Sequence, residues 1–410
     1  TDCSDPTRFD KQSNETVFAL ADELKYLWEE AQSSVVTESE RKKRVATYER
    51  KSKSYGLKYL PNGLLCCEAL RTIYRPVDHC LGDWMHMLCS GGVCGTELGL
   101  FLHVLAAAGI PLLAVNDWCL QFTLPKKQGV MDPAWLASRR LHDDHLQSMA
   151  STVLTIIPIV LAFCMDVVAP RGILGDHILC LQTLVDIMGL LQLGADGVMP
   201  YLDQLRKLIV LHARMFTSLY PLAAKPKFHH FLHLPEDVKF VGKLLSCFVC
   251  ERMHRVSRKA ALHVFRYMEP TVLADVVNRK CTMMIKRESL FETNLMVNAK
   301  QIKSGHARDL DCAKSCVLKC GQVYVGDFLW LRDTTVGKLV NCWANSHKEV
   351  TLELCVYSKT ADDPEILSTN ERKKFVDVES VVDACAWALK GPDSMRIISP
   401  LSSRVRRLHT

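Results

Sequence analysis

The stretch Lys225–Ala261 reads KPKFHHFLHLPEDVKFVGKLLSCFVCERMHRVSRKAA, in which a His-rich apolar strip, a break at Pro235 and a strongly basic helix follow one another. Glu251 stands at the head of that basic helix, and four cations lie within about two helical turns of it: Arg252, Arg255, Arg258 and Lys259. Nearby cations favour the charged form of a carboxylate, so we expect Glu251 to stay ionised. It can hold a divalent metal or neutralise its neighbours, and the basic face suits phosphates. An ordinary solvated helix with intrahelical ion pairs is the alternative.

Composition limits the class of protein. A length of 410 residues predicts two or three domains. A hydrophobic share of 48% and a charged share of 23% are typical of a globular chain. The net charge of +6 is modest, so any affinity for nucleic acid must come from local clusters. The 18 cysteines are scattered and Thr1–Asp10 has no secretory signal, from which we expect reduced cysteines in an intracellular protein.

The longest apolar run, Val153–Met165, contains Pro158 and is too short to span a membrane. We therefore predict a buried helix there and no contact with a membrane.

Residues 1–75 are predicted to form a helical and basic segment. Val17–Ala31 has apolar residues at helical spacing, and Glu38–Lys58 predicts a basic helix followed by a linker. Such a basic run is usually a solvated face, and contact with nucleic acid is the alternative. The chain begins in a polar, turn-rich stretch without Met, from which we expect a piece of a longer protein.

Residues 76–298 form the predicted core, and Asp83-Trp84-Met85-His86 opens a helix within it. Asp83 and His86 share one face of such a helix, although Asp83 could simply be its cap. The Gly-rich stretch Ser90–Gly99 lacks the Lys-Ser/Thr and the preceding strand of a phosphate loop. Before this core, Leu64–Tyr74 is predicted to form a mixed helix. Within residues 100–220 we predict a layer of helices: Leu100–Ala108, Trp135–Met149, Thr152–Val168, His177–Gln192 and Pro200–Tyr220.

Metal-ligand residue types recur without a complete ligand set. His142, Asp143, Asp144 and His145 follow one another on an expected helix, so neighbouring residues lie on different faces. His229 and His233 have the spacing of a helical zinc pair, but no Glu follows the first His. Cys247 and Cys250 form a single CxxC, and Cys312, Cys316 and Cys320 suit a helix face. We therefore do not expect zinc.

The C-terminal region changes its pattern. Residues 299–316 predict a polar linker, residues 317–400 a small β-barrel and residues 401–410 a basic tail. The barrel prediction rests on short β-branched and aromatic stretches separated by turns: Gln322–Arg332, Val336–Ala344, Glu349–Tyr357, Phe375–Asp377 and Met395–Ile398. The aromatic residues Trp330, Trp343, Tyr357 and Trp387 would fill its core or line a surface cage. The predicted fold is thus mainly α with a small C-terminal β-barrel.

Taken together, these motifs resemble the CACTA (En/Spm-like) branch of DDE transposases. The string KPKFHHFLHLPE, a gap with Gly242 and a Cys-Glu-Arg-x-x-Arg segment resemble that family's last acidic motif, and Asp83-Trp84-Met85-His86 resembles its Asp-x-Met-His string. The resemblance covers Pro76–Arg266 and implies an incomplete RNase H-like α/β core interrupted by the helical insertion. Little strand-like sequence precedes Asp83, so the first catalytic Asp has no counterpart here. Cys250 and His229 also depart from the family pattern.

The resemblance implies roles for individual residues. Asp83 and Glu251 would be catalytic and would hold Mg²⁺, and His86 and His233 would support the motif. Arg252, Arg255, Arg258, Lys259, Lys225 and Lys227 would contact the backbone of double-stranded DNA without reading its sequence. With one acid missing, we expect a catalytically incomplete, transposon-derived nuclear protein. The alternatives are a non-catalytic chromatin- or DNA-binding protein, and a helical protein whose C-terminal barrel binds chromatin or protein partners.

Overall fold

The computed structural model describes the chain with gaps: residues 13–33, 37–61, 63–79, 81–137, 139–247, 269–274, 277–278, 295–297, 299–302, 310–345, 349–360, 365–391 and 394–401. The chain divides into two compact units. Among the described residues, the smaller unit ends at Gly82 and the larger unit begins at Asp83. Each unit is considered on its own below.

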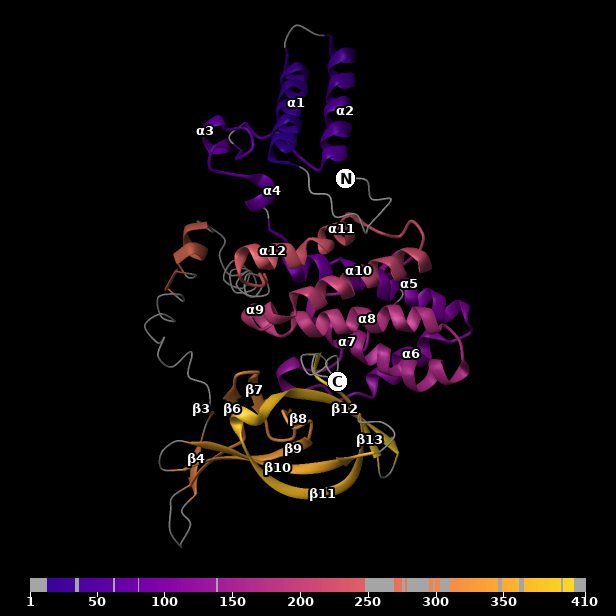
Figure 1. Ribbon diagram of the computed structural model, residues 1–410, viewed down its shortest axis with the longest axis vertical. Coiled ribbons are helices and arrows are strands. Elements are labelled where there is room, and N and C mark those ends of the chain that lie inside the picture. The colour runs from indigo at the N-terminus through magenta and orange to yellow at the C-terminus, as the bar shows by residue number, and fades with distance from the viewer. Residues whose placement is uncertain are drawn as a thin grey trace. The chain divides into compact units, whose positions relative to one another are not determined.

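The smaller unit is built on two helices that pack together, α1 (Asn14–Gln32) and α2 (Glu38–Tyr55) (Figure 1). Each begins where a hydroxyl side chain, Ser13 or Thr37, accepts a hydrogen bond from a backbone N–H of the first turn. These two helices confirm the predictions from sequence. The expected helix Leu64–Tyr74 is only partly present, as α3 (Glu68–Arg71), and α4 (Pro76–His79) ends the unit.

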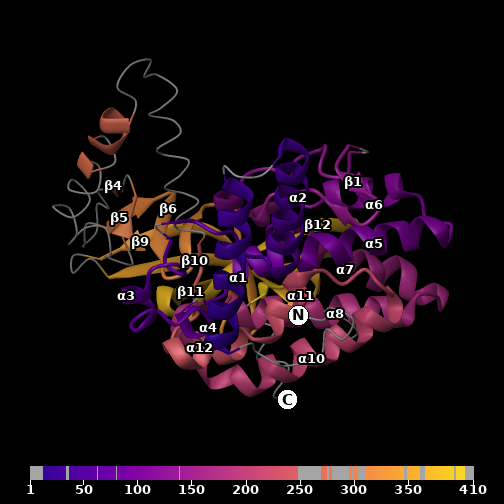
Figure 2. The same cartoon turned by 90° about the horizontal axis from the view of Figure 1, so that it is seen from above.

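The larger unit contains a helical layer with an apolar interior. Its helices are α5 (Val93–Ala107), α6 (Leu112–Leu120), α7 (Ala150–Phe163), α8 (Gly175–Leu191), α9 (Gly194–Gly197), α10 (Leu202–Leu219), α11 (Pro226–Leu232) and α12 (Leu234–Val241). Two five-residue π-helices, η1 (Met85–Cys89) and η3 (Cys164–Val168), precede α5 and follow α7. Helices α8 and α10 pack together (Figures 1 and 2). Most of the predicted helical stretches of residues 100–220 are thus confirmed.

One predicted helix, Trp135–Met149, is wrong. Its second half is a hairpin of β1 (Leu141–His142) and β2 (His145–Leu146), in which His142 pairs with His145 across the Asp-Asp turn. The two imidazole rings stack with centroids 4.6 Å apart, instead of lying on different helix faces. The Gly-rich stretch before it is explained by packing: a Cβ at Gly99 would lie 2.4 Å from the His145 carbonyl carbon, so only Gly lets the hairpin approach α5.

The helical layer is apolar enough to raise the question of a membrane. In the described residues, Met85–Ala107 and Ala150–Arg171 are long and apolar enough to span one, and the bent pair Gly175–Leu191 with Gly194–Leu219 could add a third span. The apolar run Val153–Met165 lies within the longer helical stretch Ala150–Arg171, because the helix continues through Pro158 and then through η3. The tested windows are 72% and 61% buried inside the protein. The absence of membrane contact stays a prediction.

The C-terminal region contains the predicted antiparallel barrel. Its strands are β8 (Phe328–Leu331), β9 (Val336–Ala344), β10 (Val350–Lys359), β11 (Ile366–Asp377), β12 (Val381–Gly391) and β13 (Ser394–Ile398). The order β10-β11-β13-β12-β8-β9 closes because β9 also pairs with β10 (Figure 1). Trp330 and Tyr357 are 3% and 5% exposed. These two aromatic residues therefore belong to the core and not to a surface cage.

Two departures from the expected barrel have clear causes. The range 299–316, predicted as a linker, contains β4 (Lys300–Ile302), β5 (Leu310–Ala313) and the start of β6 (Ser315–Leu318), because β5 pairs along the second half of β9. β6 forms a separate small sheet with β3 (Leu295–Met296) and β7 (Gly321–Tyr324). Strand β12 was not predicted, since its sequence VVDACAWALKG is rich in good helix formers.

The helical layer and the barrel are joined by hydrogen bonds and ion pairs. Thr123 and Trp387 exchange two backbone hydrogen bonds, of 2.7 and 3.1 Å. Arg396 Nη1 lies 3.3 Å from Asp166 Oδ1, and its Nη2 lies 3.4 Å from Glu365 Oε2. The barrel is thus attached to the helices through β12 and β13.

The RNase H-like core implied by the resemblance is not confirmed. Such a core is a mixed sheet, whereas every strand pair in the described residues is antiparallel. Between residues 76 and 298, the described strands are the two-residue β1, β2 and β3. Helices carry this region instead.

Candidate functional site

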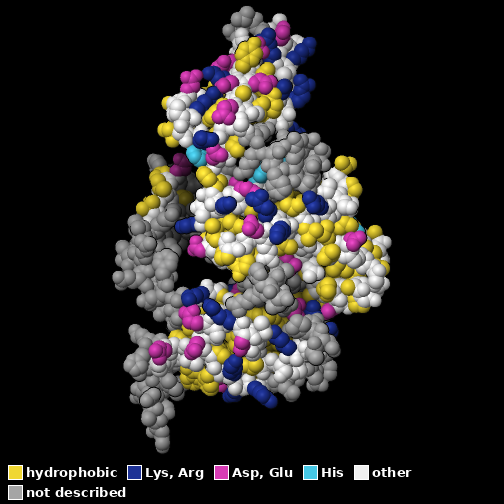
Figure 3. All heavy atoms as spheres, viewed as in Figure 1, with side chains coloured by type: hydrophobic (Ala, Val, Ile, Leu, Met, Phe, Trp, Pro, Cys, Tyr) yellow, Lys and Arg dark blue, Asp and Glu magenta, His cyan; other side chains and the backbone are white. Residues whose placement is uncertain are grey.

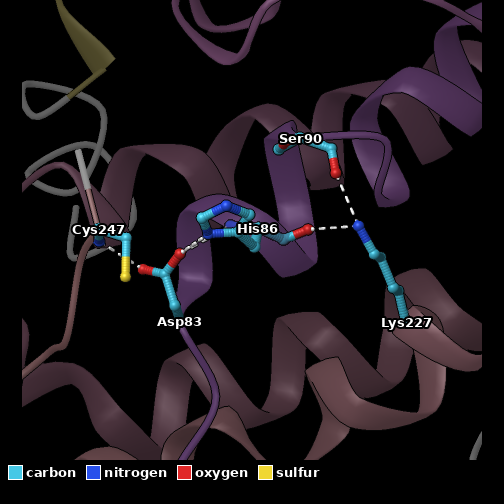
Figure 4. Close-up of polar contacts among 5 residues, drawn as sticks. All are labelled: Asp83, His86, Ser90, Lys227 and Cys247. Atoms are coloured by element: carbon cyan, nitrogen blue, oxygen red, sulfur yellow. Dashed lines mark hydrogen bonds and ion pairs between the residues drawn. The ribbon is translucent and has the colours of Figure 1, made fainter. Parts of the chain in front are cut away.

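The Asp83–His86 pair lies where the chain enters the π-helix η1. One oxygen of the Asp83 carboxylate, Oδ2, accepts a hydrogen bond of 3.0 Å from the His86 backbone N–H. The same oxygen lies 2.5 Å from His86 Nδ1 (Figure 4). Asp is favoured at a helix start because its carboxylate satisfies a free N–H of the first turn. The cap role given above as an alternative is therefore real, and the same carboxylate also orients the imidazole.

The other Asp83 oxygen connects this helix start to a distant segment. Oδ1 accepts a hydrogen bond of 2.8 Å from the backbone N–H of Cys247, which is 164 residues further along the chain (Figure 4). In the sequence, Cys247 stands out only as part of a single CxxC. A local pattern cannot reveal this contact, because it depends on how the intervening helices return the chain to Asp83.

Lys227 is hydrogen-bonded to the backbone at the end of the same π-helix. Its Nζ donates hydrogen bonds to the backbone carbonyls of His86, at 3.1 Å, and Ser90, at 2.7 Å (Figure 4). Burial, and then the charge of Lys225, lower the pKa of the Lys227 ammonium. Lys227 therefore satisfies carbonyls at a helix end, and the predicted phosphate contact would have to compete with these two bonds.

The geometry brings a carboxylate, an imidazole and a thiol together. One ligand atom from each of Asp83, His86 and Cys247 lies within 4.8 Å of the other two. We call these three residues the corner site. The side chains of Asp83 and His86 are 14% and 44% exposed, so an ion in solution can reach them. Mixed oxygen, nitrogen and sulfur donors suit Zn²⁺ and similar ions.

The expected Mg²⁺ fits the described residues poorly. Magnesium prefers oxygen ligands in octahedral geometry, and the corner site offers one carboxylate whose two oxygens already accept hydrogen bonds. The second predicted acid, Glu251, lies outside the described residues. No magnesium-dependent step can be derived from the geometry at hand.

Most of the predicted DNA contacts cannot be placed. Arg252, Arg255, Arg258 and Lys259 lie outside the described residues, as Glu251 does. Lys225 is described, and its Nζ lies 2.9 Å from Asp144 Oδ2. The neighbouring His145, and then Lys225, hold the pKa of Asp144 well below its usual range. The charge of Lys225 is thus already balanced by a protein carboxylate.

His233, predicted to support the motif, is buried against His229. The Nε2 atoms of these two imidazoles are 3.1 Å apart, and both side chains are buried. The pair belongs to the packing of α11 against α12.

A free basic surface does exist on α2. This helix has seven Lys and Arg residues against three Glu and buries no residue. Lys42, Arg50 and Lys53 are exposed, and at 100° a residue they project within about 80° of one another. Lys and Arg side chains gather on the α2 side of this hairpin (Figure 3). We call these three residues the α2 basic face.

No protein-family model matches the chain. No curated protein matches it either. The resemblance to CACTA transposases therefore rests on the motifs quoted above.

Proposed function

We propose that this chain is a transposon-derived DNA-binding protein of the CACTA (En/Spm-like) type, and that the corner site is its metal-binding centre. The observation that carries the proposal is the hydrogen bond between Cys247 N–H and Asp83 Oδ1. It joins the Asp-x-Met-His string to the segment that leads into the Cys-Glu-Arg string. In the family pattern these two strings supply acids of one site.

The separation of the two strings strengthens this argument. A helical layer of more than 100 residues intervenes, and yet the chain returns so that Cys247 bonds to Asp83. Glu251 follows Cys247 by four residues, and four residues span at most about 14 Å. Acids that share a metal pair must lie within several ångströms of each other. A reach of about 14 Å from Cys247, which bonds to Asp83, allows Glu251 to come that close to Asp83.

The proposal covers the binding of DNA and of a metal ion. An RNase H-like arrangement of Asp83 and Glu251 with Mg²⁺ would be its extension to strand cleavage, and it requires an acid and a sheet beyond the described residues. We therefore propose binding without cleavage for this chain. Nuclear location and the binding of chromatin or protein by the barrel stay predictions.

The α2 basic face is the proposed contact with the DNA backbone. Its cations are exposed along about 16 Å of helix and form no ion pair with the described residues, so they can neutralise phosphates without first breaking such a pair. Lys225 and Lys227 would each have to break contacts seen in the structure. The described residues thus shift the expected DNA contact toward the smaller unit.

The test measures binding of the full chain to generic duplex DNA by fluorescence anisotropy over a series of salt concentrations. The Arg50→Gln/Lys53→Gln double variant should weaken binding equally on unrelated sequences and reduce the salt slope by about 2, because each lost phosphate contact removes about one unit. The matched control is Lys207→Gln/Lys239→Gln, which removes two exposed cations from α10 and α12.

Equal slopes for the α2 variant and the wild type would reject the α2 basic face as the contact. A wild-type chain that does not bind duplex DNA at low salt would reject the proposed function itself.

A further inference from the structure

A second cluster of metal-ligand types lies inside the helical layer and shares no residue with the corner site. It joins Glu97 on α5, Cys180 on α8 and His212 on α10. Glu97 and His212 are each 1% exposed, and Cys180 is 0% exposed. A buried carboxylate is rare unless it is paired or binds a metal, so this cluster requires an explanation.

The three side chains converge on one point. Glu97 Oε2 lies 2.5 Å from His212 Nε2, and one ligand atom from each residue lies within 4.8 Å of the other two. Donors of a tetrahedral zinc ion are separated by about 3.3–3.8 Å, given metal–ligand distances of about 2.0–2.3 Å. An ion would thus fit after a small opening of the Glu97–His212 contact.

One carboxylate oxygen of the cluster lacks a hydrogen bond. Among the described residues, Glu97 Oε1 has no partner, although the atom is buried. The hydroxyl of Tyr220, which follows α10, is also buried without a partner among these residues. Buried polar atoms are normally satisfied, so the unsatisfied oxygen of Glu97 indicates that a component is missing from the set.

We propose that Glu97, Cys180 and His212 bind a zinc ion that ties α5, α8 and α10 together. Oxygen, nitrogen and sulfur ligands in one tetrahedral set are typical of zinc. A water molecule would take the fourth position. Because the cluster is closed to solvent, the ion has a structural role and enters as the chain folds.

Charge balance supports this assignment. Zn²⁺ with one thiolate, one carboxylate and one neutral imidazole has no net charge, which suits an apolar interior. Binding replaces the thiol proton of Cys180, which leaves to solvent, and no electron is transferred. Without the ion, the cluster buries the Glu97 carboxylate with the His212 imidazole as its ion-pair partner.

The test compares two identical substitutions, Cys180→Ser in the buried cluster and Cys247→Ser in the corner site. The full chain is purified without added metal, and its zinc content is measured by mass spectrometry. Cys180→Ser should lose about one equivalent of zinc per chain relative to the wild type. The same comparison is made in the Cys247→Ser background, where Cys180→Ser should again remove about one equivalent, so the result does not depend on what the corner site binds. Unchanged zinc content on Cys180→Ser in both backgrounds would overturn the proposal.

A second measurement covers the case in which Cys180→Ser fails to fold. The wild-type chain, unfolded in chelator and refolded with Co²⁺, should show the charge-transfer band of a cobalt thiolate, and Cys247→Ser should retain it. Loss of the band with Cys247→Ser, or a wild-type chain that takes up neither zinc nor cobalt, would overturn the proposal. Glu97 and His212 would then be a metal-free buried pair.

Discussion

The corner site and the buried cluster contain the same three donor types in opposite surroundings. At the corner, Asp83 and His86 are 14% and 44% exposed, and backbone N–H groups satisfy both carboxylate oxygens. In the buried cluster, Glu97 and His212 are each 1% exposed, and one carboxylate oxygen has no partner among the described residues. Ligand type alone therefore does not decide the role of a site. The corner site is open to solvent and its carboxylate is fully hydrogen-bonded, which suits it to bind an ion that exchanges with solvent. The buried cluster is closed to solvent and has an unsatisfied carboxylate oxygen, which suits it to hold an ion permanently.

The exposure of the side chains also ranks the carboxylate–imidazole pairs by their expected contribution to stability. Glu97–His212 is buried, Asp83–His86 is half-buried, and Asp144–His145 lies at the surface with side chains 59% and 32% exposed. Water screens charges at the surface and is absent from the interior. The loss of unfolding free energy on breaking a pair should therefore be largest for Glu97–His212, smaller for Asp83–His86 and smallest for Asp144–His145.

The largest effect is expected at the buried pair. His212→Ala leaves the Glu97 carboxylate without its imidazole partner, which should lower the free energy of unfolding by about 3–5 kcal/mol. His86→Ala, the same change at the corner site, should cost about 1 kcal/mol or less. Urea unfolding followed by circular dichroism, in buffer with chelator, measures both.

The double variant Glu97→Met/His212→Leu sharpens this test, because it removes both polar groups from the core. It should recover part of the loss, since replacing a buried pair by apolar groups of similar size is often neutral. Equal costs for His212→Ala and His86→Ala would contradict the ordering by exposure.

A smaller effect is expected when Asp83 is changed. Asp83→Ala removes the acceptor for the N–H groups of His86 and Cys247, and should cost about 1–2 kcal/mol. Hydrogen exchange should show both amides losing protection. Asp83→Asn is the matched control, because Asn caps helices as well as Asp while losing the charge that a metal ion needs. If Asn and Ala variants lose the same stability, the carboxylate acts through its charge and not as a cap.

Sequence patterns predicted the parts of this fold that depend on local periodicity. They found α1, α2, most of the helical layer and the closed barrel, because apolar spacing and strand alternation repeat over short windows. They failed at β12, where Ala, Leu and Lys favour a helix but pairing with β8 and β13 imposes a strand. They also failed at the hairpin of β1 and β2, which depends on the close approach allowed by Gly99.

The two sites show the same limit. Asp83 and His86 are three residues apart, so their pairing was visible in the sequence. Glu97 and His212 are 115 residues apart and belong to no motif, and Cys247 meets Asp83 only through the returning chain. A signal was available in Glu97, the one carboxylate in the largely apolar sequence of Val93–Ala107, since a carboxylate on a buried helix needs a partner.

The smallest effect is expected at the surface pair. Asp144 contacts His145 Nδ1 at 2.7 Å and Lys225 Nζ at 2.9 Å, and these two groups lower the pKa of its carboxyl below the ordinary value of 3.8. A lowered pKa in the folded state contributes stability above pH 3.8 that is lost as the pH falls further. The side chain is largely exposed, so Asp144→Asn should cost less than about 1 kcal/mol at pH 6. Unfolding of wild type and variant should differ less at pH 3 and in high salt. A cost as large as that of His212→Ala, or a difference that grows with acid, would mean that burial does not rank these pairs.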